Sequence, residues 1–214
     1  KGSNYQAYSP VDDDIILRPY ESFFVQRPID VEQMVFGAEG RMHYNDALKA
    51  TKTDSQKPGV NSAPARSIDG AQRNVFNFTI EGCGSDNRTR IVLNEKASTG
   101  YDCSRDAAKF FASKPSGAEI YVDADVKYDI CERPLGDGKA QLAIRTAKAG
   151  EYTITLSGRY TADWTVMLTD CETGTTVNLC EGAYSFEAAA GTTAGRFQIS
   201  FKSPVTDIDA ITAE

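Results

Sequence analysis

Histidine is the side chain that most often acts as the base in nucleophilic catalysis, and this chain of 214 residues has one, His43. A Ser-His-Asp or Cys-His arrangement needs that base beside an activated nucleophile. No GxSxG motif accompanies His43, and its position favours a solvated histidine in a loop or at a strand end. The sequence therefore predicts a protein that is not an enzyme.

Carboxylates are the second group that could do chemistry. The chain has 30 Asp and Glu residues, so pairs of acids will occur in any fold, and glycoside hydrolysis needs such a pair in a cleft. Clustered acids on loops also suit calcium, which prefers carboxylate and carbonyl oxygens. The calcium candidates are Asp123, Asp125 and Asp129, with the acidic run at 12–14 as a second cluster. Neither matches an EF-hand loop, and no cofactor other than calcium is expected.

Aromatic rings displayed on a β domain could stack on sugar rings. Trp164 shares the strand register of Val166 and Leu168, which favours a core position for its ring. Tyr160 and Tyr101 lie near turn residues, so they are the rings that we expect to be exposed and the candidates for ligand binding.

Five cysteines stand at positions 83, 103, 131, 171 and 180. They show no CxxC or Cys/His spacing, which argues against zinc and against a dense disulfide framework. An odd count leaves at least one thiol unpaired within the chain, and zero, one or two internal disulfides remain open.

The composition is that of a folded, acidic protein. A formal charge of −7 and a pI near 4.9 disfavour binding to nucleic-acid phosphates, which requires clustered Lys and Arg. The longest apolar runs are far shorter than the roughly 20 residues of a membrane-spanning helix. We therefore expect neither a nucleic-acid partner nor a transmembrane segment.

The elements that must position these residues are strands. From position 74 onward, apolar and polar residues alternate with period 2, in segments separated by glycine-rich turns. This pattern is typical of strands with one buried face. The sequence predicts an all-β fold, an antiparallel β-sandwich of jelly-roll or immunoglobulin-like type over 74–203, with one short helix at 104–111.

The chain before and after this sandwich has a different character. Residues 1–46 contain three strand-like runs and are interpreted as a remnant of an upstream β domain. Residues 47–73 are rich in Lys, Thr, Ser, Pro, Gly and Ala, which predicts a linker. Three short strands are marginal alone, so residues 1–46 either pack on the sandwich or are missing their partners; we favour the second. Residues 204–214 form a tail.

Several phrases resemble a known family, the carboxyl-terminal region of surface proteins that Bacteroidota export by the type IX pathway. They include YSPVDD at 8–13, LRPYESFFVQ at 17–26, NVFNFT at 74–79, RTRIVLNE at 88–95 and GEYTITL at 150–156. The resemblance implies an extracellular or cell-surface location, other domains of the same protein as partners, and a sorting domain after the tail. It supplies no catalytic residues, and the five cysteines depart from its pattern.

These observations favour a non-catalytic structural or interaction module of a secreted surface protein, with a protein or glycan ligand that the sequence does not name. A carbohydrate-binding module is the alternative, and part of a secreted hydrolase is the second alternative. Exposed aromatic rings on one side of the domain would favour the carbohydrate-binding module, and two facing acids in a cleft would favour the hydrolase.

Overall fold

The computed structural model of the chain describes residues 5, 7–8, 23–26, 65–66, 72–136 and 138–203. Within these residues every regular element is a strand and there is no helix, which confirms the all-β prediction. The strands are β1 Ala65–Arg66, β2 Gln72–Gly82, β3 Ser85–Leu93, β4 Ala107–Ala108, β5 Ala118–Asp123, β6 Lys127–Arg133, β7 Lys139–Thr146, β8 Gly150–Arg159, β9 Thr165–Asp170, β10 Thr175–Asn178, β11 Tyr184–Ala188 and β12 Gly191–Lys202.

The alternation in the sequence produces these strands because every second side chain enters the core. On β2 the inward residues Phe76, Phe78 and Ile80 are fully buried. The burial of β8, β9 and β11 alternates in the same way. In contrast, β5 and β6 are buried along nearly their whole length, so their outer faces are covered as well.

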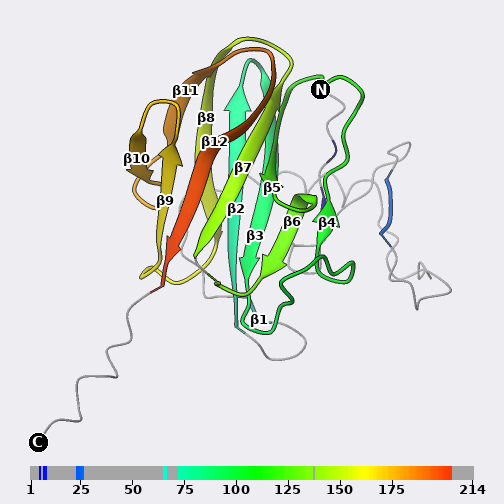
Figure 1. The fold of residues 1–214 in the computed structure, drawn as a ribbon, viewed down its shortest axis with the longest axis vertical. Helices are drawn as coiled ribbons and strands as arrows, with labels where there is room; N and C mark the ends of the chain where they lie inside the picture. The colour runs from blue at the N-terminus through cyan, green and yellow to red at the C-terminus, as the bar shows by residue number, and fades with distance from the viewer. Residues whose placement is uncertain are drawn as a thin grey trace, which may run out of the picture.

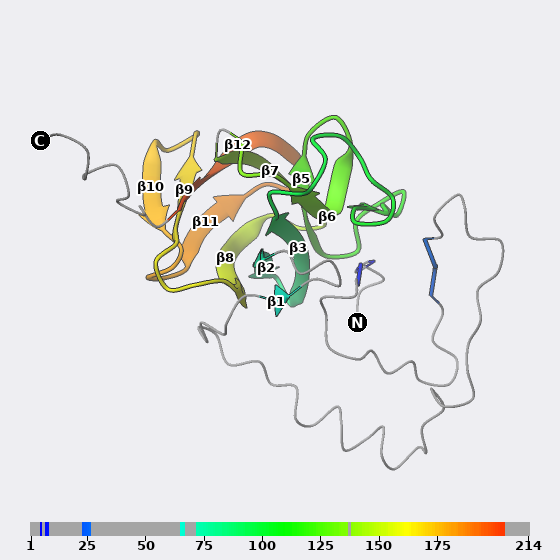
Figure 2. The same ribbon diagram turned by 90° about the horizontal axis from the view of Figure 1, so that it is seen from below.

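Hydrogen bonds connect the strands in the order β10-β9-β12-β7-β5-β6-β3-β2-β8-β11, with β1 added to β2 and β4 to β6 (Figure 1). The sheet is mixed, because β3 and β6 run parallel. It curls until β11 faces β12 (Figure 2), where the rings of Phe186 and Phe197 are 4.7 Å apart. The result is nearly barrel-shaped. The sandwich is not confirmed, because β5 and β6 join the two sides of the sheet through hydrogen bonds.

A close backbone approach fixes where β8 crosses β2. Gly158 pairs with Phe76 and has a φ of +148°, and a Cβ atom there would lie 1.9 Å from the Val75 carbonyl oxygen. Only glycine fits this position without displacing β2. The chain can therefore turn the ring of Tyr160 onto Phe76, with centroids 4.7 Å apart.

A buried ion pair closes the sheet where its two ends meet. Arg196 on β12 holds Asp170 at the end of β9: Nη2 donates to Oδ2 at 2.8 Å, and Nε donates to Oδ1 at 3.0 Å and to Oδ2 at 3.1 Å. The hydroxyl of Tyr184 on β11 donates to the same carboxylate at 2.8 Å. Arg196 also donates to the carbonyl of Glu187 at 2.9 Å. Three strands are thus joined by side chains where no backbone ladder joins β11 to β9 or β12 within the described residues.

Three expectations from the sequence have clear outcomes. Trp164 is 8% exposed and belongs to the core, which confirms its predicted position. The predicted helix at 104–111 is wrong: Asp102 caps a short turn by accepting from the Ser104 amide at 2.9 Å, after which Ala107 and Ala108 form β4 on β6. All five cysteines are free thiols.

Other predicted features lie largely or wholly outside the described residues. These are most of 1–46, most of the 47–73 linker, the 204–214 tail, His43 and the acidic run at 12–14. Within the part of the chain that the structure describes, no helix has the length and apolar character needed to cross a bilayer.

Candidate functional site

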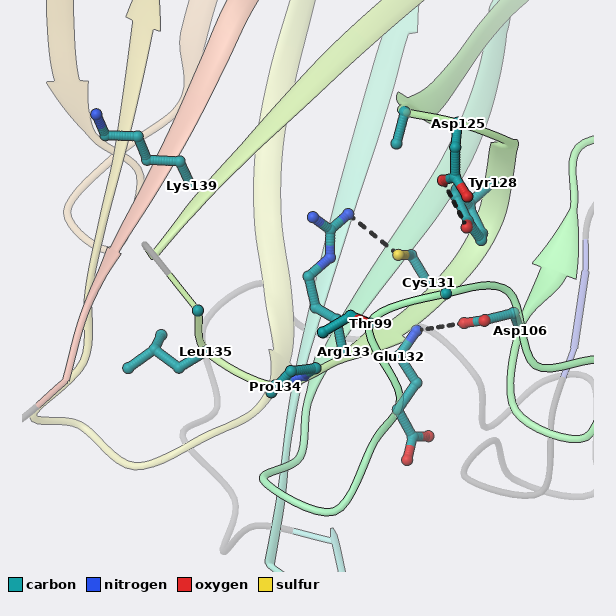
Figure 3. A pocket seen from close by; sticks show the side chains of 13 residues that line it. Thr99, Asp106, Asp125, Tyr128, Cys131, Glu132, Arg133, Pro134, Leu135 and Lys139 are labelled. Carbon is teal, nitrogen blue, oxygen red and sulfur yellow. Dashed lines mark hydrogen bonds between the residues drawn. The ribbon is translucent and has the colours of Figure 1, made fainter.

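A cavity of about 220 Å³ lies beside β6, between the β3–β4 loop, the β5–β6 turn and the β6–β7 turn. Figure 3 shows its side chains, which come from both ends of β6, from the neighbouring loops and from the start of β7. Its ionisable groups are three carboxyl groups, a guanidinium, an ammonium, a thiol and a phenol, from Asp106, Asp125, Glu132, Arg133, Lys139, Cys131 and Tyr128.

Two of the three carboxyl groups are committed to the protein itself. Asp106 accepts the Glu132 amide on Oδ1 at 2.7 Å and the Asp102 amide on Oδ2 at 2.8 Å. Burial nevertheless raises the pKa of Asp106 above its usual value, since it outweighs these hydrogen bonds. Glu132 is 2.8 Å from Arg105 and 3.3 Å from Arg73, so its charge is neutralised within the fold.

The thiol of Cys131 and the guanidinium of Arg133 form a pair on the cavity wall. Nη2 of Arg133 donates to Sγ of Cys131 at 3.1 Å. Burial raises the pKa of the Cys131 thiol, although Arg133 opposes this shift. The thiol therefore stays protonated at neutral pH, and a protonated thiol is a poor nucleophile. Nε of Arg133 is buried without a hydrogen-bond partner among the described residues.

The third carboxyl group, Asp125, is exposed and accepts a hydrogen bond from the Tyr128 hydroxyl at 3.0 Å. Burial, followed by the interaction with Asp125, raises the pKa of Tyr128 well above its usual value, so this phenol remains a donor. The ring of Tyr101 lies 5.9 Å from that of Tyr128 and is 40% exposed. Tyr101 is therefore an exposed ring, as the sequence predicted, and its neighbour Tyr128 belongs to the cavity wall.

Gln26 connects the N-terminal part of the chain to the loop beside the cavity. Its Nε2 atom donates to the carbonyl oxygens of Cys103 and Asp106, both at 2.6 Å. Its Oε1 atom accepts from the Tyr101 hydroxyl at 3.1 Å. Because Asp106 is a wall residue, Gln26 fixes one side of the cavity from a distant part of the sequence.

A second feature is an exposed aromatic surface formed by Tyr5, Phe24 and Phe110, named here the aromatic surface. The rings of Phe24 and Phe110 stack at 5.5 Å with an interplanar angle of 11°. Tyr5 lies 5.7 Å from Phe24 and 5.8 Å from Phe110. The three residues are 42%, 69% and 55% exposed in the order given. Contiguous exposed rings of this kind are typical of interaction sites.

Beneath the aromatic surface lies a buried ionic cluster. Nζ of Lys109 is 2.6 Å from Asp129 Oδ1 and 2.7 Å from Asn87 Oδ1. The amide of Ala7 donates to Oδ2 of Asp129, and Asn87 donates to the Tyr5 carbonyl at 3.3 Å. Residues near the N-terminus thus complete the hydrogen bonds of a charge pair inside the β domain.

The predicted ligand-binding residues therefore separate into two groups. Tyr101 lies at the cavity, whereas Tyr160 is 7% exposed and stacked on Phe76 in the core. The expectation that Tyr160 is exposed is wrong, because its position continues the inward register of β8 beyond Gly158.

The predicted calcium ligands do not converge on one point. Asp123 pairs with Lys127 at 2.7 Å, Asp125 with Tyr128, and Asp129 with Lys109. Among the described residues, no three His, Cys, Asp or Glu side chains are grouped so that they could hold a metal ion. The protein's own hydrogen-bond donors occupy the acids that the sequence suggested as metal ligands.

Sequence reasoning missed Arg133 and the aromatic surface. Arg133 ends β6 in a pattern that any half-buried strand could show, so no local signal singles it out. Phe24 belongs to a run, Phe23-Phe24-Val25, whose three members are all about half exposed or more. A strand with one buried face would show apolar and polar residues in alternation at 23–25. The absence of this alternation was the signal in the sequence that these apolar side chains are exposed.

Comparison with the curated proteins and with the solved structures gives no match. A family model described as a domain of unknown function, DUF8693, matches residues 2–201. The match includes the β domain, the cavity, the aromatic surface and the N-terminal residues that contact them. The chain belongs to the DUF8693 family.

Proposed function

We propose that this domain is a non-catalytic interaction module whose partner binds at the aromatic surface. The observation that carries the proposal is the contact between Tyr5, Phe24 and Phe110, three rings that pack on one another while each stays more than 40% exposed. Exposed rings of this size cost solvation free energy unless another surface covers them. Aromatic residues are also the groups that contribute most to protein interfaces.

The pairing of buried charges supports a structural rather than a catalytic role. Lys109 pairs with Asp129, Arg196 with Asp170, and Arg145 with Glu119 at 3.1 Å. Each pair links different segments of the sheet or its loops, so these charges hold the fold together. For the hydrolase alternative, Asp106 would be a candidate acid, but both of its oxygens accept backbone amides.

The proposed partner is another domain of the same secreted protein, at the cell surface or outside the cell. The support for this location is the sequence resemblance to type IX-exported surface proteins of Bacteroidota. An acidic composition and an all-β fold around one core suit such a presenting domain. The same domain would space or orient its neighbours through the aromatic surface.

Site-specific photo-crosslinking in the producing cells tests the proposal. A benzoylphenylalanine probe replaces Phe24 or Phe110 in the full-length protein, and the matched control carries the probe at Glu151, an exposed position on β8. We expect probes at 24 and 110, but not at 151, to crosslink to one defined segment outside residues 1–214. Equal labelling at all three positions, or no crosslink at 24 and 110, would refute the proposal.

A further inference from the structure

We infer that the cavity beside β6 binds a carboxylate-bearing monosaccharide, a hexuronate, through Arg133. This guanidinium lines the cavity, and its one hydrogen-bond partner among the described residues is the thiol of Cys131 at 3.1 Å. A thiol is a weak acceptor. An arginine without a carboxylate partner presents a planar fork of donors that matches a carboxylate with two parallel hydrogen bonds.

The charges around Arg133 explain why the ligand carries a single carboxylate. Glu132 is neutralised by two arginines, and Asp106 is held by two amides, whereas Asp125 is exposed and accepts one hydrogen bond, from Tyr128. Lys139 is a second cation of the wall and favours an anion in this cavity. The negative charge of Asp125 opposes a phosphate dianion more strongly than it opposes a singly charged carboxylate. A sugar acid interacts with both the positive and the negative group, because its carboxylate accepts hydrogen bonds from Arg133 while its hydroxyl groups donate to Asp125.

The size of the cavity and an exposed ring beside it indicate a single sugar ring. A volume of about 220 Å³ is below the roughly 300–1,000 Å³ of pockets that hold drug-sized ligands. Tyr101, next to the wall residue Gly100, is 40% exposed and provides a flat ring at the cavity edge. Sugar C–H groups pack on such rings while hydroxyl groups reach polar neighbours. Gln26 holds Tyr101 in place through its hydroxyl.

This inference is independent of the aromatic surface, so the two proposals fail separately. The test is a titration of the isotope-labelled full chain, followed by amide NMR shifts at Gly100, Cys131 and Gly136, with D-glucuronate and D-galacturonate as probes. The parent sugars D-glucose and D-galactose measure the role of the carboxylate, and inorganic phosphate measures simple anion binding. The variants are Arg133→Gln, Arg133→Lys and Tyr101→Ala, with Lys202→Gln as a control at an exposed cation on β12.

We expect at least one uronate to shift the cavity amides and to bind at least tenfold more tightly than its parent sugar. Arg133→Gln should weaken binding at least tenfold and Tyr101→Ala severalfold, while Lys202→Gln leaves it unchanged. If Arg133→Gln does not fold, Arg133→Lys carries the test, because an ammonium cannot form the paired hydrogen bonds and should weaken binding at least threefold. Equal binding of phosphate, or uronate binding insensitive to position 133, overturns the inference.

Discussion

Replacing Asp170 with asparagine tests whether the ion pair at the meeting point of β9, β11 and β12 holds the curled sheet closed. Asp170 is fully buried and accepts hydrogen bonds from Arg196 and Tyr184. Asparagine keeps the shape of the side chain but removes its charge, so the guanidinium of Arg196, whose side chain is 7% exposed, is left without its main counter-charge. Removing one partner of a buried pair costs about 3–5 kcal/mol.

The effect should depend on pH in a defined direction. Burial alone would raise the pKa of Asp170, but the hydrogen bonds from Arg196 and Tyr184 outweigh it and lower the pKa below its usual value. A carboxyl with a lowered folded-state pKa stabilises the protein above its unfolded pKa of about 3.9. That contribution is lost as pH falls through the folded-state pKa. The difference between wild type and Asp170→Asn should therefore be largest near neutral pH and shrink below about pH 4.

Urea denaturation followed by fluorescence is the assay, because Trp164 is the chain's single tryptophan and is 8% exposed in the core. The control is Asp123→Asn, which breaks the pair with Lys127, a residue whose side chain is 50% exposed. Exposed pairs contribute about 0–1 kcal/mol. A loss at Asp170→Asn no larger than that of the control at pH 7 would refute the role given to the buried pair.

Three further changes have expected outcomes. Lys109→Met leaves Asp129 buried without its cation and should lower the free energy of unfolding by about 3–5 kcal/mol in the same assay; a neutral result would mean that water or another group replaces Nζ. Gly158→Ala places a Cβ atom 1.9 Å from the Val75 carbonyl oxygen and should cost about 2–5 kcal/mol, whereas an unchanged midpoint would contradict the close approach of β8 to β2. Gln26→Ala should change global stability by less than about 1 kcal/mol but accelerate hydrogen exchange over 99–106; unchanged exchange there would show that Gln26 does not hold the loop.

The all-β class could be predicted because its signal is local. Residues that alternate with period 2, such as Tyr152, Ile154 and Leu156, enter the core as the pattern requires. The same period placed Trp164 correctly. If this period is continued from Leu156 through Gly158, the next inward position is Tyr160. The burial of Tyr160 was therefore predictable from its register, although nearby turn residues suggested exposure.

The helix expected at 104–111 shows why local propensity was insufficient. An apolar run of four residues in eight suits one helical face, but Lys109 in the middle of the segment is buried on Asp129. Ala107 and Ala108 instead pair with β6. The burial of Lys109 depends on an acid 20 residues away, and no helix propensity reports that partner.

The cavity could not be predicted for a related reason. Its wall joins residues 99, 100 and 106 with residues 124, 125, 128, 131–136 and 139, and their meeting depends on β3 and β6 pairing in parallel. An arginine without a carboxylate partner can be recognised only when the positions of all its neighbours are known. The sequence alone does not give those positions. Sequence reasoning named Tyr101 as an exposed ring and Asp125 as a calcium ligand, because turn positions are where exposed polar and aromatic groups gather, but it joined neither residue to a cavity.

The N-terminal residues are best understood through the polar groups that they satisfy. Asp129 is buried, and only one of its oxygens is held by Lys109; the other accepts the Ala7 amide. The carbonyl of Asp106 likewise accepts from Gln26. A buried acceptor that loses its donor costs about 1–3 kcal/mol, so a β domain that began after position 46 would carry both losses. The family match, which extends from residue 2 to 201, is consistent with one unit in which the early residues complete the charged interior of the sheet.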